Sequence, residues 1–73
     1  MTWNYRMVKR VQAGETSYTI HEAFYDAEGK VENITEDSVR AFGETPDELF
    51  EDLNRMKEAY GRPVLDYDTM EDL

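Results

Sequence analysis

Few residues of this chain are suited to catalysis. His21 is the only histidine among 73 residues, and there is no cysteine. A nucleophile, a histidine and a carboxylate act together only in a cleft, and a short chain offers little room for one. The absence of cysteine also removes thiolate metal sites and cysteine nucleophiles. We therefore expect a protein that is not an enzyme and that has no catalytic residues.

One segment near the C-terminus resembles a calcium-binding loop. Residues 66–71 read Asp-Tyr-Asp-Thr-Met-Glu, so carboxylates alternate with other residues as they do in such loops. Met70 replaces an oxygen ligand, and no glycine follows to make the turn. The chain also has no glycine-rich phosphate loop and no paired-histidine motif. The sequence predicts neither a metal site nor a cofactor.

Charge is the strongest chemical feature that remains. The chain has 17 acidic and 8 basic residues, which gives a formal net charge of −9. Residues 1–31 carry four basic and four acidic side chains, whereas residues 32–73 carry four and thirteen. An acidic surface repels the phosphates of nucleic acids and attracts basic partners, although a charge of this size can also serve solubility alone. We expect no direct DNA binding.

Residues 43–49, Gly-Glu-Thr-Pro-Asp-Glu-Leu, predict the start of a helix. Thr45 and Glu48 match a capping box, and Pro46 suits the first helical position. Gly61 and the proline that follows it end the helix, which we place at about residues 46–60. Its apolar residues recur at helical spacing and are expected to form a core-facing stripe: Leu49, Leu53, Met56 and Tyr60.

Three strands are predicted before this helix, at about residues 2–11, 16–25 and 30–42. If Ala13 and Gly14 form a two-residue hairpin loop, opposed positions sum to 27, so that Trp3 faces Phe24. One face of the hairpin is then mostly aromatic and aliphatic, and the helix should cover it. The other face is basic, and three of its residues form a candidate anion-binding surface: Arg6, Arg10 and His21.

The register of the third strand has two solutions. With a bulge at the turn closed by Gly29, Ile34 falls on the core face opposite Glu22. Without the bulge, Val31 takes the core position and Ile34 faces outward. Residues 61–73 are expected to form an extended acidic tail, in which residues 63–66 could add a short fourth strand.

These elements predict one α+β domain over residues 1–73, with a three-stranded antiparallel sheet and one helix packed on one face, in β-β-β-α order. A core of this size supplies only about 3–5 kcal/mol of stability, which makes homo-oligomerisation an option. The chain shows no signal-like segment and no apolar run of membrane length. We expect a cytoplasmic protein.

The helix and the residues before it resemble HicB-type antitoxins. The shared pattern is a helix opening Gly-x-Thr-x-x-Glu, followed by Leu and Ala at helical spacing, and comprises Gly43, Thr45, Glu48, Leu49, Leu53 and Ala59. The resemblance implies a module that binds and inhibits a basic, RNA-cleaving toxin. The Pro-Asp-Leu-Pro-Gly-Cys segment of these antitoxins is absent, and residues 61–73 offer no counterpart to their DNA-binding domain.

A second resemblance spans nearly the whole chain. It is to a group of short uncharacterised bacterial proteins, and it is carried by four segments. These are Trp-Asn-Tyr-Arg at residues 3–6, Ile-His-Glu at 20–22, Gly-Glu-Thr-Pro at 43–46 and Pro-Val-Leu-Asp at 63–66. This group implies no particular activity.

The leading interpretation is therefore a non-enzymatic, acidic protein-binding module that is HicB-like and antitoxin-like. Its candidate partner-binding surface is the acidic helix face formed by Asp47, Glu51 and Glu58. One alternative is an acidic inhibitor that mimics nucleic acid, of the kind found in phages and mobile elements. The other is small-anion binding on the basic sheet face.

Overall fold

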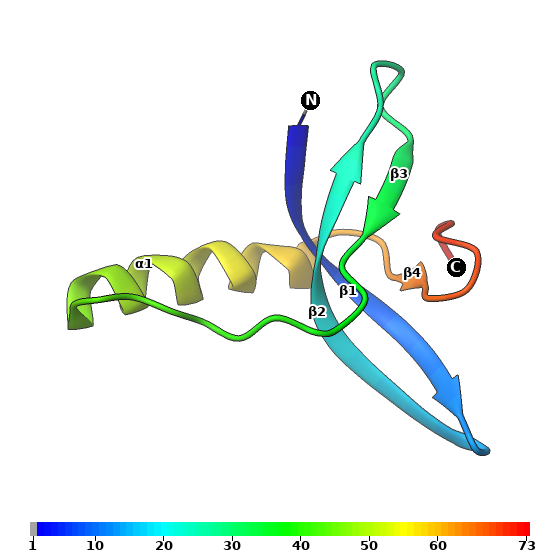
Figure 1. Cartoon of the computed structure of the whole chain (residues 1–73), viewed down its shortest axis with the longest axis horizontal. Coiled ribbons are helices and arrows are strands. Elements are labelled where there is room, and N and C mark those ends of the chain that lie inside the picture. The colour runs from blue at the N-terminus through cyan, green and yellow to red at the C-terminus, as the bar shows by residue number, and fades with distance from the viewer. Residues whose placement is uncertain (1) are drawn as a thin grey trace.

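The computed structural model describes residues 2–73 and has an α+β fold, in which one α-helix accompanies a curled, mixed sheet of four strands (Figure 1). The spatial order of the strands is β3-β2-β1-β4. In chain order the elements are β1 (Thr2–Gln12), β2 (Glu15–Tyr25), β3 (Val31–Ile34), α1 (Pro46–Lys57), the 3₁₀ turn η1 (Glu58–Gly61) and β4 (Leu65–Asp66).

The β1–β2 hairpin is the longest feature of the sheet, and it has the predicted register. Trp3 pairs with Phe24 and Gln12 pairs with Glu15, so opposed positions sum to 27. Ala13 and Gly14 both have positive φ, at 50° and 80°. Positive φ at both loop positions is typical of a type I′ turn, whose twist matches that of the flanking strands.

A fourth strand makes the sheet mixed rather than purely antiparallel. β4 runs parallel to β1, with Val8 beside Leu65. The chain then folds back on itself, because the Asp66 carboxylate accepts hydrogen bonds from the backbone N–H groups of Asp68 and Thr69. The short fourth strand expected within residues 63–66 is present at Leu65–Asp66. The extended path predicted for residues 61–73 was wrong, since side-chain turns and the pairing with β1 give this segment a defined path.

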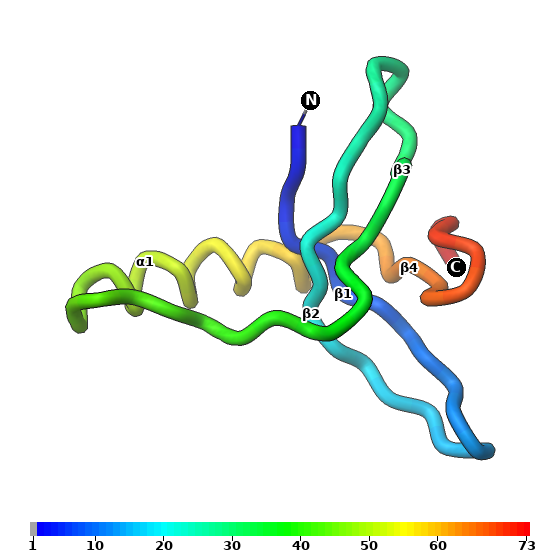
Figure 2. The backbone as a smooth tube through the Cα atoms, viewed as in Figure 1, coloured from blue at the N-terminus to red at the C-terminus, as the bar shows by residue number. Residues whose placement is uncertain are grey.

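The third strand is shorter than the predicted range of 30–42. β3 ends at Ile34, and the acidic stretch that follows forms a bend. The chain keeps isolated contact with β2 through hydrogen bonds from Thr35 N to Glu22 O and from Val39 N to Ile20 O. Residues 35–45 then run alongside α1 (Figure 2).

The main core lies on the sheet face that was predicted to be open. Val8, Ala23 and Leu65 are completely buried there. Around them pack the partly buried residues Tyr25, Val31, Ile34 and Tyr67. A bulge between Phe24 and Tyr25 places Ile34 opposite Ala23, so neither predicted register for β3 was correct. The prediction failed because β4 and the C-terminal segment supply the cover for this face.

α1 begins as predicted but does not pack as predicted. The hydroxyl of Thr45 accepts a hydrogen bond from Glu48 N at 3.1 Å. The helix leaves the sheet at a steep angle, and only its C-terminal end lies beside β1 (Figure 1). Its buried residue is Asp52, and Ala59 is buried in η1. The stripe of Leu49, Leu53 and Tyr60 is exposed, so its expected place in the core was wrong.

Within residues 2–73, no helix is both long enough and apolar enough to cross a bilayer.

The close approach of the segment before α1 to the helix predicts that alanine is tolerated at one glycine and not at another. A Cβ at Gly43 would collide with the backbone nitrogen of Leu49 and lie 2.7 Å from the carbonyl carbon of Glu48. Gly43→Ala should therefore lower the free energy of unfolding by about 1–3 kcal/mol, the usual range for overpacking. Chemical denaturation, monitored by circular dichroism, measures this change in the free energy of unfolding.

Gly61→Ala is the matched control, because a Cβ at Gly61 meets nothing within 4 Å. This variant should keep the wild-type stability or gain slightly, since alanine has less freedom in the unfolded chain. Equal losses in both variants would contradict the close approach at Gly43.

Candidate protein-binding surface

The predicted acidic residues lie together on one exposed side of the helical segment. Asp47, Glu51 and Glu58 are spaced by four and seven residues, which places them on one side of a helix, here named the acidic side. All three are exposed. Glu58 lies 3.8 Å from the Arg62 guanidinium, an exposed pair of little energetic weight. Asp47 and Glu51 make no ion pair within the described residues 2–73.

Asp52 holds α1 in its position, and this residue was missed by the sequence interpretation. Its Oδ1 accepts a hydrogen bond from the Tyr5 hydroxyl of β1 at 2.8 Å. Its Oδ2 accepts another from the backbone N–H of Phe42 at 2.9 Å. One carboxylate therefore joins α1, the sheet and the segment of residues 35–45 that precedes the helix. The available signal was the spacing of Asp52, Met56 and Ala59, a second helical stripe that begins with an acid.

The same contacts shift the pKa values of Asp52 and Tyr5. The N–H of Phe42 and the hydroxyl of Tyr5 both donate to the Asp52 carboxylate, and they lower its pKa. Burial raises the pKa of Tyr5 to about 12, and the hydrogen bond to the negative Asp52 adds to this rise. The pair is therefore held as a neutral phenol and an ionised carboxylate across the neutral pH range.

The predicted basic sheet face is not an open surface. Arg6 is buried, and its guanidinium donates to Pro63 O at 2.7 Å, to Asp72 Oδ1 at 2.8 Å and to the Tyr25 hydroxyl at 2.8 Å. These bonds tie the C-terminal segment to β1 and β2. The expectation that Arg6 forms part of an exposed basic face was therefore wrong.

His21 and Arg10 are also engaged within the fold. His21 is buried, with Nδ1 2.9 Å from Thr35 O and Nε2 2.8 Å from the Thr19 hydroxyl. Since a carbonyl only accepts, Nδ1 carries the hydrogen in that bond. The Arg10 guanidinium stacks 3.9 Å above the Tyr67 ring. The three basic residues share a face as predicted, but the C-terminal segment and residue 35 occupy it.

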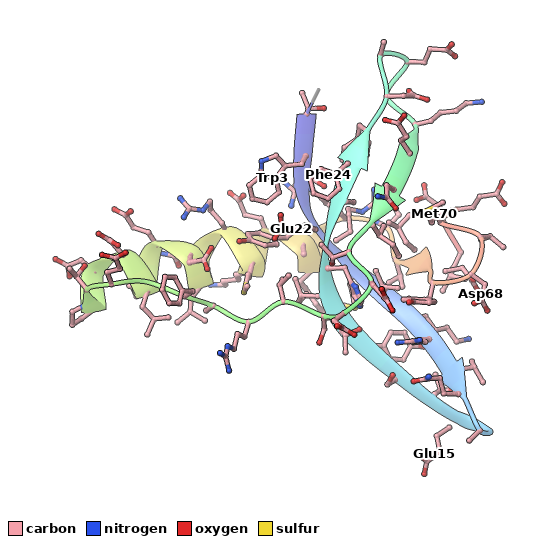
Figure 3. All side chains as sticks on the ribbon, in the orientation of Figure 1. Trp3, Glu15, Glu22, Phe24, Asp68 and Met70 are labelled. Atoms are coloured by element: carbon pink, nitrogen blue, oxygen red, sulfur yellow. The ribbon has the colours of Figure 1, made fainter. Side chains whose placement is uncertain are left out.

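Figure 3 shows Trp3, Glu22 and Phe24 gathered where α1 meets the sheet, and Asp68 and Met70 in the C-terminal loop. No group of three or more His, Asp or Glu side chains within residues 2–73 is arranged to hold a metal ion. Every buried side-chain nitrogen and oxygen of these residues has a hydrogen-bond partner. The exposed acidic side of α1 is the feature left to interpret.

The Tyr5–Asp52 pair predicts a specific dependence on pH. The folded pKa of Tyr5 lies above its unfolded value near 10, so its contribution to stability is complete below pH 10 and lost as the pH rises through about 12. Asp52 has a lowered folded pKa, so its contribution is present above its ordinary pKa of 3.8 and lost as the pH falls below it.

The ionisation of Tyr5 at high pH can be measured by following tyrosinate absorbance during an alkaline titration. One of the five tyrosines should ionise late, and Tyr5→Phe should remove that late component. Tyr60→Phe, at an exposed position, is the control and should leave the late component in place. A late component that survives in Tyr5→Phe would assign it to another residue and contradict the Asp52 contact.

Comparisons with protein-family models, with curated proteins and with solved structures gave no match for this chain. The functional interpretation therefore rests on the residues of the chain and on their arrangement.

Proposed function

We propose that this protein is a non-enzymatic, acidic protein-binding module of HicB-like type, which binds a basic partner through Asp47, Glu51 and Glu58. The observation that carries the proposal is the exposure of these three carboxylates on a helix that stands away from the sheet (Figure 1). Asp47 and Glu51 have no ion-pair partner within residues 2–73 and Glu58 has only an exposed one, so these carboxylates remain available to cations on another protein.

The contacts that hold α1 in a fixed position support this role. Thr45 caps the helix N-terminus, and Asp52 anchors its middle to Tyr5. A surface that is fixed before binding loses less conformational entropy when the partner docks. The net charge of −9 adds a long-range attraction that raises the rate of encounter with a basic protein. A basic, RNA-cleaving toxin is one partner with the required chemistry, which makes the proposal antitoxin-like.

Small-anion binding on the sheet face has less to support it. Arg6 and His21 are buried and already bonded within the protein, and Arg10 stacks on Tyr67. An anion would have to displace these contacts, including the bond between Arg6 and Asp72. We therefore place the binding function on α1.

Charge reversal on α1 tests the proposal. Glu51→Lys combined with Glu58→Lys should abolish capture of specific partners from lysate of the source cells, because like charges would then face each other. Quantitative mass spectrometry of the captured proteins measures the loss. Captured partners of the wild type should also dissociate as the salt concentration rises, because salt screens exposed charges.

Glu15→Lys combined with Glu28→Lys is the matched control. It makes the same change in net charge at two exposed positions away from α1, one at the first residue of β2 and one in the turn between β2 and β3. Partners retained by this control and lost from the α1 variant would support the acidic side. Partners retained by both variants, or lost equally from both, would contradict it. Release of the same partners by added DNA or RNA would instead favour a mimic of nucleic acid.

A further inference from the structure

The side of α1 opposite the acidic side is apolar and exposed. Along it lie residues that are between 38% and 82% exposed: Phe42 in the preceding segment, Leu49, Phe50 and Leu53 in α1, and Tyr60 in η1. We call these five residues the apolar stripe. A helix of 12 residues is marginal in water without tertiary packing on its apolar side. The N-terminal turns of α1 project beyond the sheet, and the segment of residues 35–45 that runs beside them leaves the stripe exposed (Figure 1).

The same chain has a second uncovered apolar surface, on the outer half of the β1–β2 hairpin. Alternation along the strands places Met7, Lys9 and Val11 on the sheet face that also carries Tyr5, and the hairpin register pairs them with Ile20, Tyr18 and Thr16. Val11 and Tyr18 are each 57% exposed. α1 is bonded to this face at Tyr5, through Asp52 in the middle of the helix.

The exposed area is of the size that a dimer requires. Phe42, Phe50 and Tyr60 are 68%, 64% and 82% exposed, and Tyr18 is 57% exposed. Since an aromatic side chain covers about 150–250 Å² when fully buried, these four offer roughly 400–700 Å² per copy before the aliphatic residues are added. A standard interface buries about 800 Å² on each partner, so these four side chains alone supply at least about half of that area.

The charges of the two surfaces are complementary. The first nine residues of α1 carry four acidic side chains and no basic one. The hairpin surface carries the half-buried Lys9, which makes no ion pair within residues 2–73. The negative charge of this helix therefore attracts the unpaired Lys9 of a second copy at long range, without placing the acidic side in the contact.

We propose that the apolar stripe is covered by a second copy of this chain, in a two-fold dimer where α1 of each copy packs on the outer β1–β2 hairpin of the other. Each copy offers both surfaces, so the two contacts are equivalent and the assembly closes at two copies. The acidic side of α1 stays outside this contact. Dimerisation and the binding of a basic partner can therefore fail independently.

Sedimentation equilibrium over a range of concentrations tests the proposal. The wild type should reach twice the monomer mass of 8.6 kDa. Leu53→Glu on the stripe and Tyr18→Glu on the hairpin should each weaken the dimer by at least about 30-fold, as expected for a charge placed in an interface hot spot. Both positions are about half exposed in the single chain, so each variant should keep the wild-type circular dichroism spectrum.

Two controls separate this geometry from others. Ser17→Glu lies one residue from Tyr18 on the opposite hairpin face, and Glu58→Gln lies on the acidic side; both should dimerise as the wild type does. An equimolar mixture of Leu53→Glu and Tyr18→Glu should associate more strongly than either variant alone, because one of the two contacts then joins unaltered surfaces.

The proposal is overturned by any of three results. These are a wild type that stays monomeric at millimolar concentration, a Tyr18→Glu variant that dimerises normally, and a mixture that associates no better than its components. The second result would arise if two α1 helices paired directly with each other.

Discussion

The placement of α1, on which the candidate surfaces depend, rests on one carboxylate, that of Asp52. It accepts a hydrogen bond from the Tyr5 hydroxyl of β1 and another from the backbone of Phe42, and so it joins three segments that are far apart in the chain. Because α1 leaves the sheet immediately beyond this point, few other contacts hold it (Figure 1). The direction of α1, and everything presented along it, follows from this junction.

The same constraint explains why the apolar and acidic sides of α1 are both available. The sheet contacts α1 through the side that carries Asp52, which lies to one side of the apolar stripe. Leu49 and Leu53 therefore remain exposed, although their spacing is that of a core-facing helix. Association with a second copy would remove this apolar surface from water, which the small core of a 73-residue chain does not do alone.

Local chemistry made parts of the fold predictable. The loop at Ala13 and Gly14 fixed the hairpin register, and the Thr45 cap fixed the start of α1. The choice of core face was not predictable in this way, because it depends on the return of residues 63–72 to bind Arg6. For the candidate site, helical spacing was enough to group Asp47, Glu51 and Glu58. The only signal for Asp52 was its spacing with Met56 and Ala59, which does not reveal its hydrogen bonds to Tyr5 and Phe42.

The central claim is that α1 is a docking element whose apolar stripe is covered by the outer hairpin of a second copy. Hydrogen–deuterium exchange measured at increasing protein concentration tests it most directly. The amides of residues 46–57 and of residues 7–20 should become protected together as the concentration rises, while those of β3 keep a constant rate. Exchange of residues 46–57 that stays fast at every concentration would contradict the claim.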